Sequence, residues 1–240
     1  MYGADVAEVY EDLYVAGQGK DYAAEAGRVT ELVRRHRPAA DSLLDVACGT
    51  GAHLAHLRHT FSRVAGVELS EPMRQVALRR LPDVPVYAGD MRDFDLGESF
   101  DAVTCLFSSI GYVADLAQLH AAVARMAAHL RPGGVLVIEP WFTPDAWRDG
   151  HLGHTVACRD GRTVVSMSYS SRSGRTSRME VHYLVGEPSG GVRHFRDTHV
   201  MTLFTTGEYE QAVAAAGLAV AGWHDGFSAG RDLLVATRPA

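Results

Sequence analysis

The segment Leu43-Leu-Asp-Val-Ala-Cys-Gly-Thr-Gly51 is the most informative part of the sequence for the fold. Its apolar first half predicts a buried strand, its glycines predict a tight turn, and the run that begins near Ala52 has a helical pattern. Adjacent glycines let the backbone approach a ligand closely, and the N-terminus of the next helix suits polar or anionic groups. The segment therefore predicts a strand, a ligand-binding turn and a helix in succession.

Strands and helices continue to alternate on both sides of this segment. Helices are expected over 21–37, 70–80, 116–130 and 207–216, and strands over 42–47, 64–68, 84–87, 100–107, 135–139, 218–223 and 233–237. Strands that alternate with helices indicate an α/β fold with a doubly wound parallel sheet.

Residues 155–204 have a different pattern. Apolar residues alternate there with polar ones between Gly, Ser and Pro turns, which predicts an antiparallel β insertion. Residues 155–205 hold seven arginines against four acids, a local charge of +3 in a chain of net charge −6. The overall acidity argues against a general nucleic-acid binder, whereas the basic insertion allows a local anion site.

Composition and residue spacing also indicate in which compartment the protein acts and whether it binds a metal. No apolar run approaches the ~20 residues that a membrane helix needs, and the acidic start lacks the pattern of a signal peptide. Three cysteines without CxxC spacing favour reduced thiols and a cytoplasmic protein. His53, His56 and His59 recur at helical spacing, but the sequence places no further ligand with them, so no metal site is expected.

Acidic residues follow the next two strands after the glycine turn. Glu68 ends the second strand, from which a carboxylate can accept both hydroxyls of an adenosine ribose, and Asp90 with the Met91 backbone could read an adenine edge after the third. A dinucleotide fingerprint would have a third glycine three positions after Gly51, where Leu54 stands, so NAD is disfavoured. The order of glycine turn, acid and acid along one sheet edge indicates a nucleoside cofactor without a pyrophosphate.

Three segments resemble class I S-adenosylmethionine (SAM)-dependent methyltransferases: residues 43–51, Gly66-Val-Glu-Leu-Ser70 and Gly89-Asp-Met-Arg-Asp-Phe94. A closer resemblance, to the nucleotide-linked amino-sugar N,N-dimethyltransferases of antibiotic pathways such as those making desosamine and mycaminose, covers nearly the whole chain. The segments that carry it are Gly19-Lys-Asp-Tyr-Ala-Ala-Glu-Ala26, Met91-Arg-Asp-Phe94, Phe107-Ser-Ser-Ile-Gly-Tyr112, Pro132-Gly-Gly134, Glu139-Pro-Trp141, Arg178-Met-Glu-Val-His182 and Thr202-Leu-Phe204.

The resemblance implies a Rossmann-like sheet of seven strands, the last antiparallel, with an antiparallel β insertion after the fifth strand. It also implies one methyltransferase domain over 1–240, with a helical cap at about 1–38 and the insertion at about 151–205. The implied substrate is a dTDP-linked amino-deoxysugar that is methylated twice with SAM as the methyl donor and no metal. The implied assembly is a homodimer.

The resemblance also assigns site residues. It places against the cofactor Tyr10, Ala47, Gly49, Glu68, Asp90, Met91 and Leu106. It places Tyr2 and Arg231 near the substrate and Tyr112 beside the amine, where we expect Tyr112 to orient the nitrogen rather than remove its proton.

The chain departs from the family in the insertion. Relatives have an arginine where this chain has Ser166 and a histidine where it has Tyr169, so Arg172 or Arg178 would have to hold the diphosphate. These changes leave open which amino sugar is the substrate and which nucleotide carries it.

Three alternatives remain at this stage. The first is a methyltransferase of another small-molecule amine or hydroxyl, the second is a non-catalytic SAM-binding protein, and the third is an NAD oxidoreductase. An oxygen acceptor would need a positioned base more clearly than an amine does.

Overall fold

The computed structural model describes residues 3–228 and 230–240. Its helices are α1 (Ala4–Glu11), the π-helical segment η1 (Asp12–Gly17), α2 (Tyr22–His36), α3 (Ala52–Leu57), α4 (Glu71–Arg80), the 3₁₀ turn η2 (Ser109–Tyr112), α5 (Leu116–Ala128) and α6 (Thr206–Ala215). Its strands are β1 (Ser42–Val46), β2 (Arg63–Glu68), β3 (Val86–Ala88), β4 (Phe100–Cys105), β5 (Leu130–Ile138), β6 (Leu152–Arg159), β7 (Arg162–Ser173), β8 (Thr176–Glu187), β9 (Gly191–Thr202), β10 (Ala219–Ser228) and β11 (Arg231–Thr237).

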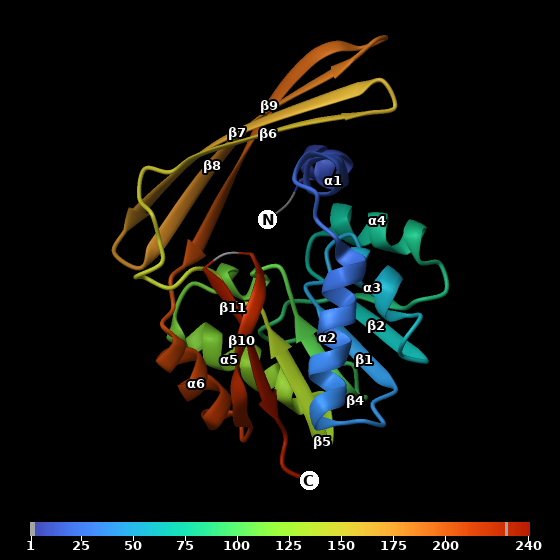
Figure 1. Ribbon diagram of the computed structural model, residues 1–240, viewed down its shortest axis with the longest axis vertical. Helices are drawn as coiled ribbons and strands as arrows, with labels where there is room; N and C mark the ends of the chain where they lie inside the picture. Colours follow the sequence, from blue (N-terminus) through green and yellow to red (C-terminus); the bar gives the residue numbers. More distant parts are fainter. Residues whose placement is uncertain (1–2, 229) are drawn as a thin grey trace.

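Seven of the strands form the central sheet, in the order β10-β11-β5-β4-β1-β2-β3 (Figure 1). β1 pairs in parallel with both β2 and β4, whereas β11 pairs antiparallel with β5 and β10. The expected seven-stranded sheet with an antiparallel last strand is therefore confirmed. The strand order reverses at β1, where the crevice that α/β sheets use for ligands opens at the carboxyl ends of the strands.

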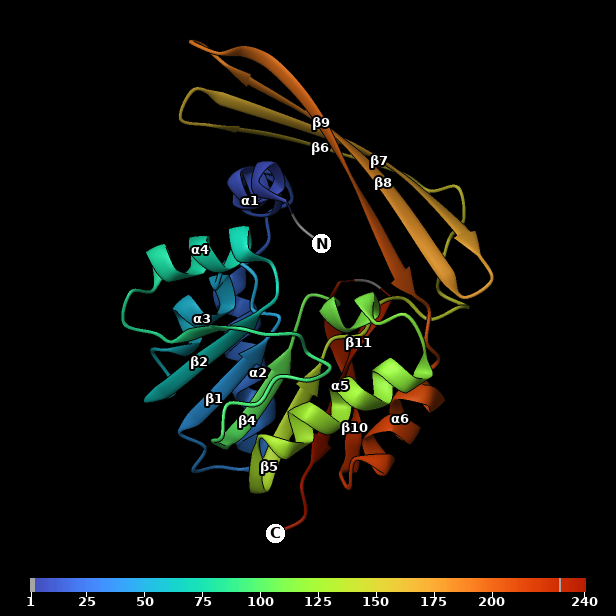
Figure 2. The ribbon, with the colours of Figure 1, turned by 180° about the vertical axis from the view of Figure 1, so that it is seen from behind.

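Helices cover both faces of this sheet, as the two opposite views show (Figures 1 and 2). Successive residues of β1 pack in opposite directions: Leu44 joins the core formed with α5 and α6, and Leu43 joins the core formed with α2 and α3. Burial on both faces explains why the strand sequences are nearly continuous apolar runs.

The remaining strands form a separate antiparallel sheet in the order β6-β7-β8-β9 (Figure 2). It occupies residues 152–202 and stands apart from the central sheet with α1 beneath it. Its inner face packs on that helix, because Val181, Tyr183 and Val185 share a buried cluster with Val6 and Val9. The predicted antiparallel insertion after the fifth strand is confirmed.

Some boundaries differ from those expected. β5 begins at Leu130 instead of Val135 because its first residues pair with Phe100 across an irregular register. β4 ends at Cys105, so Phe107 belongs to the following turn. No helix in the described part of the chain is long and apolar enough to cross a membrane.

Candidate active site

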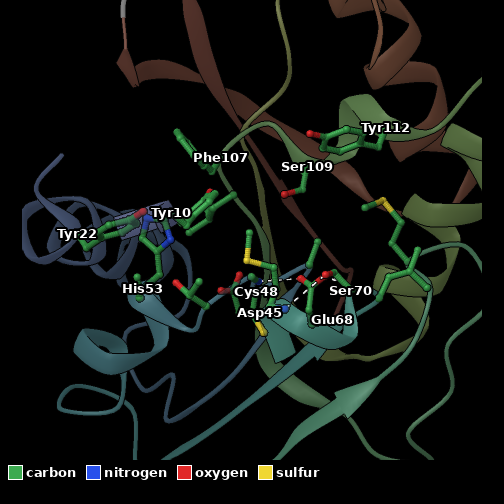
Figure 3. A pocket seen from close by; sticks show the side chains of 18 residues that line it. Tyr10, Tyr22, Asp45, Cys48, His53, Glu68, Ser70, Phe107, Ser109 and Tyr112 are labelled. Carbon is green, nitrogen blue, oxygen red and sulfur yellow. Dashed lines mark hydrogen bonds between the residues drawn. The ribbon is translucent and has the colours of Figure 1, made fainter. Parts of the chain in front are cut away.

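One cavity opens at the carboxyl ends of β1, β2 and β4 (Figure 3). Seven of the residues expected from the sequence line it: Tyr10, Ala47, Gly49, Glu68, Met91, Leu106 and Tyr112. Tyr22, Asp45, His53, Phe107 and Ser109 also line it. Tyr22 and His53 lie at the opposite end of the cavity from Tyr112.

The turn after β1 shapes the floor of this cavity. Gly49 has φ +58°, and a Cβ added to it would meet no protein atom within 4 Å, so the backbone is bare where a ligand could pass. Gly51 serves packing instead, because a Cβ there would lie 3.1 Å from Leu81 and 3.2 Å from Ala77. Gly49 therefore leaves room for a ligand, whereas Gly51 allows close packing within the protein.

Glu68 is the buried acid at the end of β2, with 8% of its surface exposed. Its carboxylate accepts hydrogen bonds from the backbone N–H of Gly49 at 2.8 Å and of Ser70 at 2.7 Å. Burial raises the pKa of Glu68, although these two hydrogen bonds oppose the rise. The backbone thus fixes the carboxylate beside the bare glycine turn.

Asp45 is a second buried carboxyl group in the cavity. Its Oδ1 accepts a hydrogen bond of 2.7 Å from the Thr104 hydroxyl on the neighbouring strand β4. Burial raises the pKa of Asp45 to about 6, against the lowering effects of His53 and of the Thr104 hydrogen bond. Two carboxyl groups in one apolar cavity favour a ligand that carries positive charge.

Asp90 lies at the edge of this region and is not among the residues that line the cavity, whereas its neighbour Met91 is. The Arg92 guanidinium donates to both carboxylate oxygens of Asp90, at 2.8 and 2.5 Å. The hydrogen bonds from Arg92 lower the pKa of Asp90. A contact of Asp90 with adenine stays a prediction.

A buried polar chain stands behind the other end of the cavity. Lys20 Nζ lies 2.6 and 2.7 Å from the two Glu25 oxygens, and His53 Nε2 lies 2.7 Å from Glu25 Oε2. Burial raises the pKa of Glu25, but hydrogen bonds from His53 and Lys20 outweigh it and lower that pKa overall. His53 is therefore held in a protein network, and the described residues form no group of three His, Cys, Asp or Glu suited to a metal ion.

The turn between β4 and η2 has an unusual backbone. Phe107 and Ser108 have φ of +52° and +61°, a region that residues other than glycine rarely adopt. Three contacts hold it: Phe107 N donates to Glu139 at 2.7 Å, Ser108 Oγ donates to the Pro140 carbonyl at 2.8 Å, and Arg231 donates to Ser108 Oγ at 2.9 Å. Arg231 therefore supports this turn, and its expected contact with the substrate stays a prediction.

Tyr112 is the last residue of η2, and its side chain lies at the cavity edge near Ser109 (Figure 3). Its hydroxyl oxygen lies 2.8 Å from Nδ1 of His199, a buried residue of β9. Burial lowers the pKa of His199, opposed by the charge of Asp197. The insertion thus contributes a side chain that contacts the predicted orienting residue.

Gly111 determines how closely η2 approaches its surroundings. A Cβ there would lie 2.8 Å from Trp141 Cβ and 2.9 Å from Met201 Cε. The absence of a side chain at Gly111 therefore allows this close approach.

Gly111→Ala should push η2 outward and misplace Tyr112. This should lower kcat about tenfold or more, since a 1 Å misplacement of a reacting group can cost ~100-fold in rate. Steady-state kinetics would measure this, and the affinity for the expected cofactor, SAM, should change little. Gly207→Ala, where the added Cβ meets nothing within 4 Å, is the matched control; an equal kcat for both variants would contradict the prediction.

The residues expected to bind substrate are placed differently from one another. Arg178 lies on the outer face of β8, exposed and 3.3 Å from Glu180, and the structure does not bring it to the cavity. Arg172 donates to the carbonyls of Gly174 and Pro144. A diphosphate contact by either arginine stays a prediction, and Tyr2 lies outside the described residues.

Sequence reasoning missed the buried partners of the site. His199 lies 87 residues after Tyr112, and no local motif links the two. Trp141, the last residue of the segment Glu139-Pro-Trp141, packs behind η2 and donates to Ser177 instead of lining the cavity. Asp45 was part of the quoted motif, and its strand-end position is the signal that could have identified it.

The fold and the cavity together fit SAM. The fixed carboxylate of Glu68, the bare backbone at Gly49 and the apolar side chains of Met91 and Leu106 suit an adenosine, and Asp45 suits the cationic amino-acid end. These features are typical of SAM-dependent methyltransferases.

Comparisons with known proteins agree with this class. A family model for a methyltransferase domain matches residues 43–134. The chain is 53% identical, over 98% of both chains, to a dTDP-3-amino-3,4,6-trideoxy-alpha-D-glucopyranose N,N-dimethyltransferase of Streptomyces venezuelae. It is 48% identical, over 99% of its length and 94% of the relative, to a dTDP-4-amino-2,3,4,6-tetradeoxy-D-glucose N,N-dimethyltransferase of Saccharopolyspora spinosa.

A solved structure gives the same result. SAM-bound CalS10, an amino pentose methyltransferase of Micromonospora echinaspora involved in calicheamicin biosynthesis, superposes with a TM-score of 0.88 at 47% identity, over 99% of this chain and 98% of that one. The chain belongs to the family of SAM-dependent amino-sugar N,N-dimethyltransferases.

Proposed function

We propose that this protein transfers two methyl groups in succession from SAM to the amino group of a dTDP-linked amino-deoxysugar in antibiotic sugar biosynthesis. The observation that carries the proposal is the 53% identity, over almost the full length of both chains, to a relative named for this reaction. The two relatives are named for amines at different sugar carbons, so the proposal covers C-3 and C-4.

The proposed roles follow the cavity. Glu68 accepts the ribose hydroxyls, and Asp90 and Met91 contact the adenine. Leu106 packs against the cofactor, and Tyr10 lies near its methionine end with Asp45. Bound SAM supplies an electrophilic methyl group on a positively charged sulfur. The buried side chains exclude water, and an apolar cavity lowers the pKa of a substrate amine so that the amine arrives neutral. Alignment of the reactants can then supply ~7–11 kcal/mol, and a strong general base is unnecessary.

Tyr112→Phe tests the role proposed for Tyr112. The variant should slow turnover without abolishing it, because the phenol orients the amine and a tyrosine of pKa about 10 is a poor base. Single-turnover rates at saturating SAM would measure the effect. Complete loss of transfer with SAM still bound would contradict the orienting role.

The decisive experiment incubates the protein with SAM and dTDP-sugars carrying an amine at C-3 or C-4, and follows product masses with time. Successive gains of one and two methyl masses on one sugar would support the proposal. SAM binding without transfer to any sugar would overturn the proposed acceptor and move the search to other amines and hydroxyls.

We also propose that the chain is one domain over 1–240 in which the helical cap, about 1–38, and the β insertion, about 151–205, enclose the site. The buried cluster shared by α1 and the inner face of the insertion supports this division. The protein is proposed to act in the cytoplasm, where its free thiols Cys48, Cys105 and Cys158 would stay reduced.

A homodimer completes the proposal, and the outer face of the insertion supports it. That face exposes large apolar side chains from all four strands: Leu152, Val156, Met167, Tyr169, Leu184, Val192 and Val200. Apolar patches of this kind are typical of protein interfaces.

Met167→Glu combined with Leu184→Glu should convert a dimer to a monomer in light-scattering measurements. Val220→Glu, at an exposed apolar position on β10, is the control, and an unchanged mass of the double variant would contradict this interface.

A further inference from the structure

The contact between Tyr112 and His199 joins two parts of the fold. Tyr112 ends the η2 turn of the methyltransferase core, and His199 lies on the inner face of the insertion strand β9 with 3% of its surface exposed. The phenol oxygen and Nδ1 are 2.8 Å apart, within hydrogen-bond distance. A phenol carries one proton, so the direction of this hydrogen bond determines what Tyr112 can offer to a substrate.

We propose that His199 accepts the phenol proton of Tyr112 at Nδ1, so that the Tyr112 oxygen meets the sugar amine as an acceptor. His199 is then a positioning residue that acts through Tyr112. The inference rests on the proposed function and adds a residue and a hydrogen-bond direction to it.

The direction matters because of the single lone pair of the amine. A phenol that donated its proton to the amine nitrogen would occupy that lone pair, which must attack the methyl carbon. A phenol whose proton is held by His199 can accept an N–H of the amine, which leaves the lone pair toward the methyl group. His199 thereby selects the productive orientation.

The protonation state of His199 agrees with this direction. Burial lowers the pKa of the imidazole, and Asp197, on the same strand, opposes that shift without reversing it. A neutral imidazole has one unprotonated nitrogen, which can accept the phenol proton when it is Nδ1.

Counting N–H groups gives the number of methyl groups that the site can direct. In each transfer the nitrogen lone pair forms the N–C bond, the C–S bond breaks with its electron pair on sulfur, and the ammonium formed loses a proton to water. A primary amine has two N–H groups, its monomethyl product has one and the neutral dimethyl product has none. An acceptor at Tyr112 therefore orients the first two transfers and not a third.

Kinetics of two His199 variants test this. His199→Phe keeps a ring but cannot accept the phenol proton, and it should lower kcat about tenfold, the value of one ordinary hydrogen bond, with KM for the sugar and Kd for SAM within about twofold of wild type. His199→Asn keeps an acceptor near the place of Nδ1 and should recover most of the loss. Equal rates for wild type and His199→Phe would overturn the proposal.

The Tyr112→Phe background separates positioning from a structural role. His199→Phe should have no further effect on kcat there, because the proton that His199 would accept is absent. Losses that multiply in the double variant would mean that His199 does not act through Tyr112, and would overturn the proposal.

Nitrogen-15 NMR of the imidazole in the protein without substrate gives a readout independent of activity. The signals of His199, identified by their loss in His199→Asn, should show an unprotonated Nδ1 and a protonated Nε2. A protonated Nδ1 would overturn the proposal even if the His199→Phe variant failed to fold. The tautomer holds or fails whether or not a dTDP-sugar is methylated, so failure of this inference is distinguishable from failure of the proposed function.

Discussion

Glu68→Gln is expected to weaken SAM binding by about two orders of magnitude. Hydrogen bonds to a charged group contribute about 1.5–3 kcal/mol each, and the Glu68 carboxylate can accept both ribose hydroxyls while the backbone fixes it through Gly49 and Ser70. Glutamine keeps only one acceptor oxygen. Its NH₂ group, a donor, would lie opposite one of the two backbone N–H groups, which are also donors, so that hydrogen bond would be lost. Isothermal titration of SAM measures the loss.

Glu71→Gln is the matched control for this prediction. Glu71 begins α4 three residues later, but it is exposed and pairs with Arg74 instead of lining the cavity. The control should bind SAM as wild type does, and thermal unfolding of both apoproteins checks that each is folded. Wild-type affinity in Glu68→Gln would show that the ribose is held by other residues.

The sequence predicts those parts of the fold whose structure depends on residues close together along the chain. The segment 43–51 combines an apolar run, glycines and a helical pattern within nine residues, and each feature restricts the backbone locally. Glu68 could be placed because the carboxyl ends of parallel strands meet at one sheet edge. The sequence does not fix element boundaries as well, because β5 starts five residues earlier than its apolar run through pairing with a distant strand.

Contacts that depend on strand register could not be predicted. Successive strand residues point to opposite faces, so a shift of one position would exchange Arg178, on the outer face of β8, with its inward-facing neighbours. The same rule places His199 inward, 87 residues from Tyr112, on a strand whose own sequence gives no sign of that partner. The contacts that the insertion makes with the site therefore cannot be predicted from the sequence and are seen only in the structure.

Asp45→Asn is expected to make the protein without SAM more stable near neutral pH. Burial raises the pKa of Asp45 from 3.8 to about 6, so the native state holds this proton more tightly than the unfolded state does. Between about pH 4 and pH 6 the native state binds more protons, and the free energy of unfolding falls as the pH rises. Above pH 6 the ionised carboxylate costs about 3 kcal/mol.

Asparagine would carry no charge and would keep an oxygen for the Thr104 hydroxyl. Urea unfolding should therefore give a variant that is more stable than wild type at pH 7.5, by up to about 3 kcal/mol, and equally stable near pH 4. A variant less stable than wild type at pH 7.5 would contradict the cost assigned to the buried charge.

SAM binding by Asp45→Asn should change in the opposite direction. The negative charge that destabilises the empty cavity attracts a cofactor with a cationic sulfur and an ammonium group, and its removal should weaken binding about tenfold, as one charge-assisted hydrogen bond is worth. Saturating SAM should therefore raise the stability of wild type more than that of the variant. A gain in stability together with a loss of SAM affinity in one variant would show that the Asp45 charge serves ligand binding at the expense of stability. Neutralising a purely structural carboxyl group would instead lower stability and leave SAM affinity unchanged.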